Sequence, residues 1–293
     1  MDIDQARQLV EYAATKTRPR WEQYAVSWNA IDEVFIVRGY EQGGFESWKF
    51  AELLKAHGIF SISKLGTILS GYRGNPKYLR KFAGGMASPF YEGLKSGTYG
   101  DEGQRFHECV AGYRGKAGAW FWSKLWQMLV CCHHLKGNYA GSFAHFLKSK
   151  YAAFTDVEAV SDGQLLSCLS DEWQRFKKAS KPWNELYGIG ENVFDYVLGD
   201  VKEAAFVKDS YKLDSANIHF LRVTGIAGLI GELDYDVVVN FLKALELPYS
   251  IREINKGLYT YCSVSEAINF GFCRDLQKCD GCEVNRLCEK NIG

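Results

Sequence analysis

The sequence Leu186-Tyr-Gly-Ile-Gly190 runs directly into Glu191-Asn-Val-Phe-Asp-Tyr-Val-Leu198, whose apolar residues recur on one face of a helix. Another helix is predicted before it, with Ser180 as its N-cap and Pro182 in its first turn. Two glycines that flank one apolar residue allow a tight turn and expose backbone N–H groups at the start of the second helix. The stretch therefore predicts a helical hairpin with a phosphate site, although an ordinary helix–helix turn explains the same residues.

The rest of the chain also has helical spacing. Apolar residues recur three and four positions apart, and only 5 of the 293 residues are proline. The stretch Glu33-Val-Phe-Ile-Val-Arg38 is β-prone but has no obvious partner strand. The segment Ala117–His134 is apolar on nearly every face, as expected for a helix surrounded by others, and its aromatic side chains are expected to pack there. We therefore predict a mostly α-helical fold.

Four of the nine cysteines fall within sixteen residues near the C-terminus, at Cys273, Cys279, Cys282 and Cys288. Only the middle two form a close pair, whereas all-cysteine zinc sites usually consist of two close pairs that are farther apart. The spacing therefore favours a 4Fe-4S cluster that staples this loop, with zinc as the alternative. The other cysteines lie in apolar surroundings and are expected to be buried free thiols: Cys109, Cys131, Cys132, Cys168 and Cys262.

An aspartate stands at the expected start of a later helix. In the segment Lys212–Ile226, Asp214 occupies the N-cap position, and Ile218 and Leu221 mark the inner face of the helix that follows. On local sequence alone, this residue is a helix cap.

Charge gives little indication of a partner. The chain has 35 Lys and Arg and 35 Asp and Glu, so its overall field does not attract polyanions. Local groups of basic residues could still contact phosphates, although such groups are more often solvated faces. These groups are Arg73, Lys77 and Arg80; Arg114 and Lys116; and Arg274, Lys278, Arg286 and Lys290. No stretch approaches the length of a membrane helix, and a cytosolic protein is expected.

In this order, the glycine hairpin, the aspartate and the four-cysteine loop resemble the helix-hairpin-helix DNA glycosylase superfamily, specifically its iron–sulfur branch with endonuclease III and the adenine-mismatch glycosylases. The family hairpin reads Leu-Pro-Gly-Val-Gly, where this chain has Leu186–Gly190. The family aspartate follows Val or Leu, as Asp214 follows Leu213, and Gly225 keeps the spacing to a glycine that often closes the next helix. The resemblance covers roughly residues 117–290.

The resemblance implies a helical barrel domain with the hairpin at residues 111–206 and an iron–sulfur domain at 207–293, preceded by an N-terminal helical extension at 1–110. It implies a cleft between these domains, double-stranded DNA as the partner and Asp214 as the catalytic carboxylate beside a flipped-out nucleotide. Such a carboxylate stabilises the positive charge that builds on the sugar as the base leaves. The DNA-binding residues would be Tyr187, Gly188, Ile189, Gly190 and Asn192. A monomer is expected, in the cytoplasm with the nucleoid, or in the nucleus of a eukaryote.

Several residues depart from the family pattern. Asn192 stands where bifunctional members carry a Schiff-base lysine, so a monofunctional N-glycosylase that leaves an abasic site is expected. The first cysteine gap is five residues, where the family usually has six. A longer segment after the hairpin leaves Asp209 as a second candidate carboxylate, and another register would put Asn217 at the aspartate position. That register favours a non-catalytic DNA-binding protein. The zero net charge favours another alternative, a nucleoside or nucleotide N-glycosidase.

Overall fold

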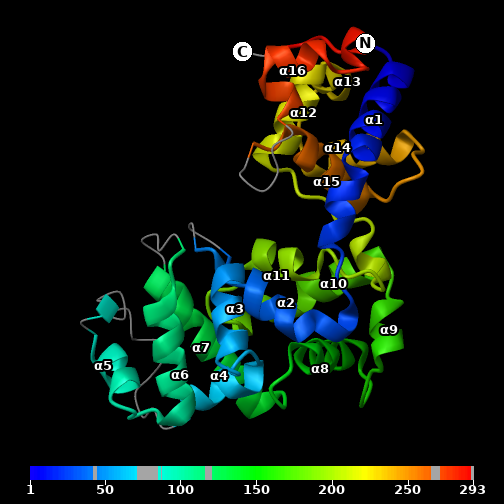
Figure 1. Cartoon of the computed structure of the whole chain (residues 1–293). Coiled ribbons are helices and arrows are strands. Elements are labelled where there is room, and N and C mark those ends of the chain that lie inside the picture. Colours follow the sequence, from blue (N-terminus) through cyan, green and yellow to red (C-terminus); the bar gives the residue numbers. More distant parts are fainter. Residues whose placement is uncertain (42–44, 71–84, 87, 116–120, 265–270, 292–293) are drawn as a thin grey trace. The chain divides into compact units, whose positions relative to one another are not determined.

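The structure is a computed structural model that describes residues 1–41, 45–70, 85–86, 88–115, 121–264 and 271–291 (Figure 1). Contacts divide the chain into two compact units. Unit 1 combines Met1–Ala25 with Ala205–Gly293, and unit 2 is Val26–Ala204. Within the described residues, no helix has the length and apolar character needed to span a membrane.

The prediction of an all-α protein is confirmed. Over the described residues the chain forms helices and one isolated parallel bridge, between Val26 and Val201, and no strand. The bridge ties together the two ends of unit 2: Val26 N–H donates to the carbonyl of Asp200 at 2.8 Å, and Lys202 N–H donates to the carbonyl of Val26 at 3.0 Å.

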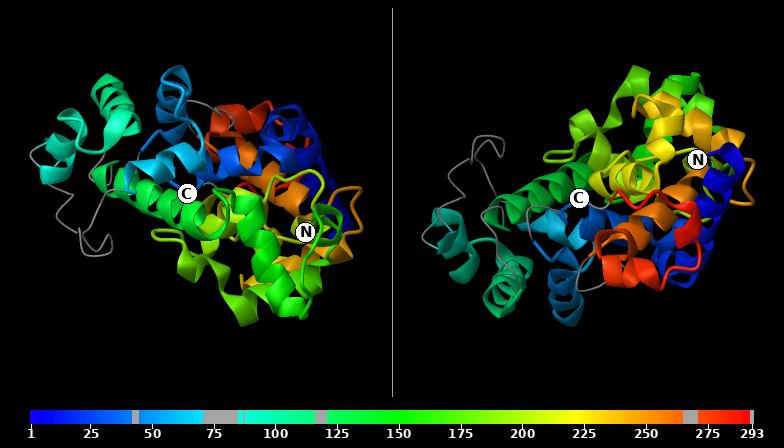
Figure 2. Two further views of the ribbon diagram at one scale, coloured as in Figure 1. Left: turned by 90° about the horizontal axis from the view of Figure 1, so that it is seen from below. Right: turned by 90° about the horizontal axis from the view of Figure 1, so that it is seen from above.

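Unit 1 joins the first helix of the chain to its C-terminal part. Its α-helices are α1 (Ile3–Trp21), α12 (Ser215–Thr224), α13 (Ile226–Ile230), α14 (Tyr235–Ala244), α15 (Ile251–Cys262) and α16 (Leu276–Asp280). Its 3-10 helices are η1 (Glu22–Tyr24), η6 (Ala205–Val207), η7 (Phe272–Arg274) and η8 (Asn285–Leu287). In Figures 1 and 2 the blue helix α1 lies beside the red C-terminal segments, which it contacts at η8.

Helix α1 packs along α15. It begins at a capping box in which Asp2 and Gln5 satisfy each other's backbone N–H groups. The two helices approach so closely that a Cβ atom on Gly257 would lie only 2.6 Å from Cα of Ala14. The absence of a side chain at this position of α15 is therefore what permits the contact.

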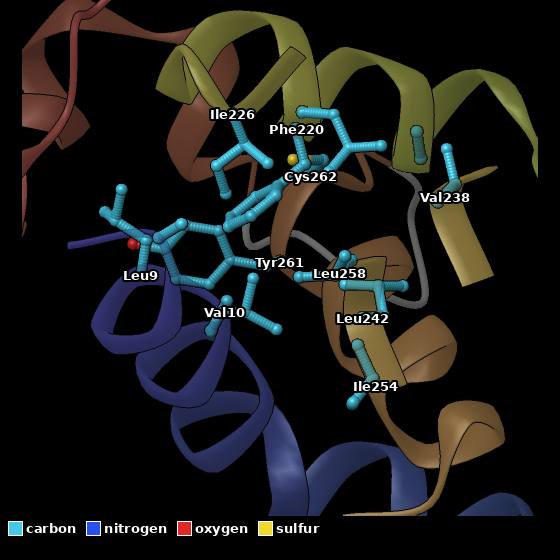
Figure 3. Packing of buried hydrophobic residues seen from close by; sticks show 14 of the residues in the cluster. Leu9, Val10, Phe220, Ile226, Val238, Leu242, Ile254, Leu258, Tyr261 and Cys262 are labelled. Carbon is cyan, nitrogen blue, oxygen red and sulfur yellow. The ribbon is translucent and has the colours of Figure 1, made fainter. Parts of the chain in front are cut away.

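The core of unit 1 is filled by buried side chains from α1, α12, α14 and α15 (Figure 3). Its large members include Leu9, Val10, Phe220, Leu221, Val238, Leu242, Ile254, Leu258 and Tyr261. Burying one side chain of this size stabilises a fold by roughly 1.5–3 kcal/mol. Because Leu9 and Val10 belong to this core, the first helix is an integral part of the unit.

Unit 2 holds the remaining helices. Its α-helices are α2 (Ile31–Arg38), α3 (Ser47–Ala56), α4 (Ile62–Ile68), α5 (Pro89–Lys95), α6 (Gly100–Gly112), α7 (Phe121–Asn138), α8 (Phe143–Thr155), α9 (Asp162–Leu166), α10 (Ser170–Ser180) and α11 (Glu191–Leu198). Its 3-10 helices are η2 (Trp28–Ala30) and η5 (Pro182–Glu185).

Helix α7 is a buried helix of unit 2, as its all-round apolar sequence predicts. Phe121 and Trp126 are 4% and 2% exposed, and Trp126 meets Phe90 edge to face at 5.1 Å between ring centroids. A Cβ atom on Gly66 of α4 would lie 2.5 Å from the carbonyl oxygen of Cys132, so α4 packs directly on the backbone of α7. These aromatic residues therefore have the expected packing role.

The β-prone stretch Glu33–Arg38 is helical, as part of α2. Val34, Phe35 and Ile36 are all buried, and Phe35 stacks on Phe143 at 4.5 Å. A β-branched run buried from several sides can be accommodated in a helix because tertiary packing outweighs local β propensity.

Ser180 is not the N-cap that the sequence suggests. It is the last residue of α10. The C-cap of that helix, Lys181, has the left-handed conformation (φ 40°), and η5 begins at Pro182. The local turn therefore comes one residue later than predicted, and only a short 3-10 helix precedes the hairpin.

The domain boundaries predicted at residues 110 and 206 differ from the boundaries of the two compact units. The second boundary lies close to Ala204, where unit 2 ends, but the first 110 residues do not stay together. Met1–Ala25 packs with the C-terminal part, and the chain from Val26 onward belongs with the hairpin. Several predicted features lie outside the described residues: Arg73, Lys77, Arg80, Lys116 and the segment 117–120.

The close approach of α1 and α15 gives a matched pair of glycine variants. We expect Gly257→Ala to lower the free energy of unfolding by about 1–3 kcal/mol, because its methyl group must displace the α1 backbone. Gly228→Ala in α13 places its methyl group in open space and should be neutral or stabilising by about 0.5 kcal/mol. Urea unfolding followed by circular dichroism measures both, and equal effects would contradict the close contact.

Candidate metal centre and carboxylate site

The four clustered cysteines line one pocket in unit 1. Cys273, Cys279, Cys282 and Cys288 all face it. The rest of its wall is mainly apolar and comes from α1, α12, α15, η7 and the loop itself: Leu9, Tyr12, Phe220, Val223, Thr224, Tyr261, Phe272, Val284 and Asn285. Residues at the two ends of the chain thus enclose a single cysteine-lined space.

Short turns within the loop bring the cysteines to this pocket. The side chain of Asp275 caps α16 by accepting from Gln277 N–H at 2.9 Å. Cys282 N–H donates to the carbonyl of Cys279 at 3.0 Å, and Cys288 N–H donates to the carbonyl of Asn285 at 3.3 Å. The loop is therefore folded by its own hydrogen bonds around the pocket.

Helix α12 anchors both sides of the loop. His219 Nε2 lies 2.7 Å from the carbonyl oxygen of Cys273, within hydrogen-bond distance. At the other end of the loop, Glu289 N–H donates to the carbonyl of Thr224 at 3.1 Å, and Asn291 N–H donates to that of Val223 at 3.0 Å. The first and last cysteines are consequently held against the same ten-residue helix.

The sulfur atoms lie in a desolvated environment. Burial raises the pKa of Cys288 to about 11 and also raises the pKa of Cys279. A hydrogen bond with the neighbouring thiol of Cys262, together with burial, raises the pKa of Cys273. At neutral pH these thiols are therefore protonated, and a metal centre that binds their thiolate forms must displace the protons.

Across the part of the chain that the structure describes, no three His, Cys, Asp or Glu side chains are placed to share one metal ion. The four cysteines nevertheless line a common pocket, and in a 4Fe-4S cluster each ligand binds a different iron atom.

Asp214 caps the other end of α12. Its Oδ1 atom accepts from Ala216 N–H at 3.0 Å, from Asn217 N–H at 2.9 Å and from Asn217 Nδ2 at 3.0 Å. The side chain is half-buried. No hydrogen bond to Oδ2 occurs among the described residues, so one carboxylate oxygen is held firmly and the other is not held by these residues.

Asn217 lies beneath this carboxylate and is fully buried. Its Oδ1 accepts from the hydroxyl of Tyr211 at 2.9 Å, and its Nδ2 donates to Asp214. Burial, together with the charge of Asp214, raises the pKa of Tyr211. Asn217 therefore acts as a structural link between Tyr211 and Asp214, and its position does not favour the register that would place it beside a nucleotide.

Asp209, the second candidate, differs from Asp214 in its surroundings. It is half-exposed and forms a loose ion pair with Lys243, whose Nζ lies 3.7 Å from Oδ1. Exposed pairs of this kind fix a side chain weakly. Of the two carboxylates, Asp214 is the one whose side chain is held in a fixed orientation.

The predicted hairpin lies in unit 2, between η5 and α11. Gly188 has φ 81°, in the left-handed region, and a Cβ atom there would lie 2.3 Å from the side chain of Gln127. Gly190 is the N-cap of α11 and makes no side-chain capping hydrogen bond. The side chain of Ile189 is 5% exposed and anchors the turn, and its N–H donates to the carbonyl of Leu186 at 3.0 Å.

A buried lysine stabilises the hairpin. This lysine was not predicted from the sequence. Lys177 of α10 is 4% exposed, and its Nζ lies 2.6 Å from Oδ2 of Asp195 and 3.4 Å from Oε1 of Glu191. Both carboxylates belong to α11, so the ion pairs join the helices on the two sides of the turn. The spacing between these residues gives no sign of this pairing in the sequence.

Basic and acidic residues are mixed in the cysteine loop. Residues 274–290 contain four cations, Arg274, Lys278, Arg286 and Lys290, and four carboxylates, Asp275, Asp280, Glu283 and Glu289. The loop is therefore electrically balanced, which weakens its predicted role as a phosphate-binding surface. Arg114 is exposed and donates to the carbonyl of Ala111 at 2.6 Å.

No protein-family model, curated protein or solved structure matches the chain.

The two hairpin glycines give a test of the turn. Gly188→Ala should lower the free energy of unfolding by about 1–3 kcal/mol, because alanine is strained at φ 81° and its methyl group meets Gln127. A Cβ atom on Gly190 meets nothing within 4 Å, so Gly190→Ala should change it by less than about 0.5 kcal/mol. Chemical unfolding of both variants decides the matter, and a larger loss for Gly190→Ala would count against this turn.

The cysteine pocket predicts which thiols hold iron. Replacing Cys273, Cys279, Cys282 or Cys288 by alanine should abolish iron and acid-labile sulfide in protein purified without oxygen, because each lines the pocket. Cys168→Ala, a buried thiol of unit 2, should keep both. Iron and sulfide assays with visible absorption provide the measurement. Zinc in the wild-type protein, or iron retained by all four variants, would refute the assignment.

Proposed function

We propose that the chain is a monofunctional DNA N-glycosylase of the helix-hairpin-helix type with a 4Fe-4S cluster. The observation that carries the proposal is that one helix, α12, bears Asp214 at its N-terminus and lines the cysteine pocket with Val223 and Thr224 near its C-terminus. A rigid element of this kind fixes a carboxylate relative to a metal-stapled loop. The resemblance of the motif order to the family supports the same assignment.

The residues present fit an iron–sulfur cluster. The thiolates of Cys273, Cys279, Cys282 and Cys288 would hold it, and the apolar walls would exclude water from it. When bound, the cluster supplies a covalent staple for the loop between η7 and η8. The steps of base removal are assigned to the side chains of the chain itself.

Asp214 suits the stabilisation of positive charge. Its Oδ1 is held by three N–H donors, so the carboxylate cannot rotate away as the reaction proceeds. As the N-glycosidic bond breaks, positive charge builds on the sugar, and a fixed carboxylate lowers the energy of that state. The free Oδ2 is the atom that would face the sugar or orient the attacking water.

The hairpin would bind the DNA backbone of double-stranded DNA. Backbone N–H groups around Gly188 and Gly190 open α11 without a side-chain cap, and such a helix start attracts a phosphate group. Tyr187 is half-buried and Asn192 is exposed, so both side chains are accessible for contacts along the strand. Asn192 has no amine for a Schiff base, which supports hydrolysis without strand cleavage.

Release of free bases from DNA tests the proposal. Duplexes with damaged, mispaired and naturally modified bases are incubated with the iron-loaded protein, and released bases are identified by mass spectrometry. Asp214→Asn should slow release by about 10²- to 10⁴-fold, because asparagine keeps the N-cap but carries no charge. Asp209→Asn, on the same loop, should leave the rate unchanged.

The alternatives predict other results in the same assay. A non-catalytic DNA-binding protein would release no base from any duplex, although its duplex binding would weaken steeply with added salt. A nucleoside or nucleotide N-glycosidase would act on the free substrates, with little dependence on salt.

A further inference from the structure

One tyrosine hydroxyl is directed at a cysteine of the pocket. Tyr261, near the end of α15, is 2% exposed, and its Oη lies 3.1 Å from Sγ of Cys282. Its ring stacks on Phe272 at 4.8 Å between centroids and meets Phe220 edge to face at 6.1 Å. Figure 3 shows this ring among side chains of the unit 1 core. The packing fixes the ring and thereby the direction of the hydroxyl.

The hydrogen bond must run from oxygen to sulfur once Cys282 binds a metal. A thiolate has no hydrogen of its own, so only the phenol O–H of Tyr261 can donate. Because Tyr261 is buried in apolar surroundings, water does not compete for its hydroxyl. Hydrogen bonds to charged sulfur in such surroundings are stronger than bonds between neutral groups.

A second donor reaches the cysteines from the backbone. Lys290 N–H donates to Sγ of Cys288 at 3.3 Å. This donor belongs to the main chain and persists whatever the side chain. The Tyr261 hydroxyl, in contrast, can be removed by a single substitution that keeps the aromatic ring.

We propose that Tyr261 sets the reduction potential of the cluster by donating this hydrogen bond to Cys282, an inference that rests on the 4Fe-4S cluster proposed above. Reduction adds one electron to the cluster and increases the negative charge on its sulfur ligands. A hydrogen-bond donor stabilises the reduced form more than the oxidised form and so raises the potential. Tyr261 is thus a positioning and tuning residue, and the cluster is more than a staple for the loop.

The test is Tyr261→Phe in the whole 293-residue chain purified without oxygen. Phenylalanine keeps the stacking on Phe272 and removes only the O–H group. Potentiometric titration, in which an electrode supplies the electrons and electron paramagnetic resonance follows the reduced cluster, should give a more negative potential than in the wild type. Tyr12→Phe is the matched control, because Tyr12 lines the same pocket and its ring meets Tyr261 at 6.2 Å, but its hydroxyl forms no hydrogen bond to sulfur among the described residues.

A second measurement identifies the hydrogen bond itself. Exchange into deuterium oxide should shift the iron–sulfur stretching bands of the wild type in resonance Raman spectra, and the part of this shift that comes from Tyr261 should be missing in Tyr261→Phe. An unchanged potential in Tyr261→Phe, or an equal change in Tyr12→Phe, overturns the tuning role while leaving the glycosylase proposal intact. Wild-type protein without iron and sulfide overturns both the tuning role and the proposed cluster.

Discussion

The direct contact between α1 and α15, at Ala14 and Gly257, is the constraint on which unit 1 depends. It joins the first helix of the chain to its last helices, so two segments separated by all of unit 2 share one core. The same contact also builds the pocket: α1 contributes Leu9 and Tyr12, and α15 contributes Tyr261. The close packing of α1 on α15 therefore places the apolar side chains that line the cysteine pocket.

These apolar walls disfavour the charged thiolate form of the cysteines buried against them. Burial raises the pKa values of Cys279 and Cys288, so assembling four thiolates in this space without a cation is unfavourable. The loop still has fixed attachments that do not depend on metal, at His219, Val223 and Thr224 of α12. The protein thus holds the loop ends in place, and in the proposed cluster the positive charge of the iron would compensate for the desolvation of its ligands.

Sequence reasoning predicted the features that are encoded locally and missed those that depend on distant contacts. The spacing of the cysteines, the cap at Asp214 and the glycine turn at Gly188 are local patterns. In the structure the four cysteines line one pocket, Asp214 caps α12 and Gly188 has a left-handed φ. The participation of α1 in the cysteine pocket has no local signal, because its apolar spacing shows only that it has a buried face. The β propensity of Glu33–Arg38 does not decide its structure for a related reason, since burial of its branched side chains among other helices is not visible in the sequence.

The three candidates Asp214, Asp209 and Asn217 differ in their surroundings, which the sequence motif does not show. The amide of Asn217 forms hydrogen bonds with Tyr211 and Asp214, and its side chain is fully buried. Asp209 is half-exposed, and its loose ion pair with Lys243 holds the side chain weakly. Asp214 combines a held oxygen with one that makes no hydrogen bond within the described chain. A carboxylate that accepts three hydrogen bonds on one oxygen is a well-oriented negative charge. For the glycosylase proposed above, this geometry would suit electrostatic stabilisation of a cationic sugar.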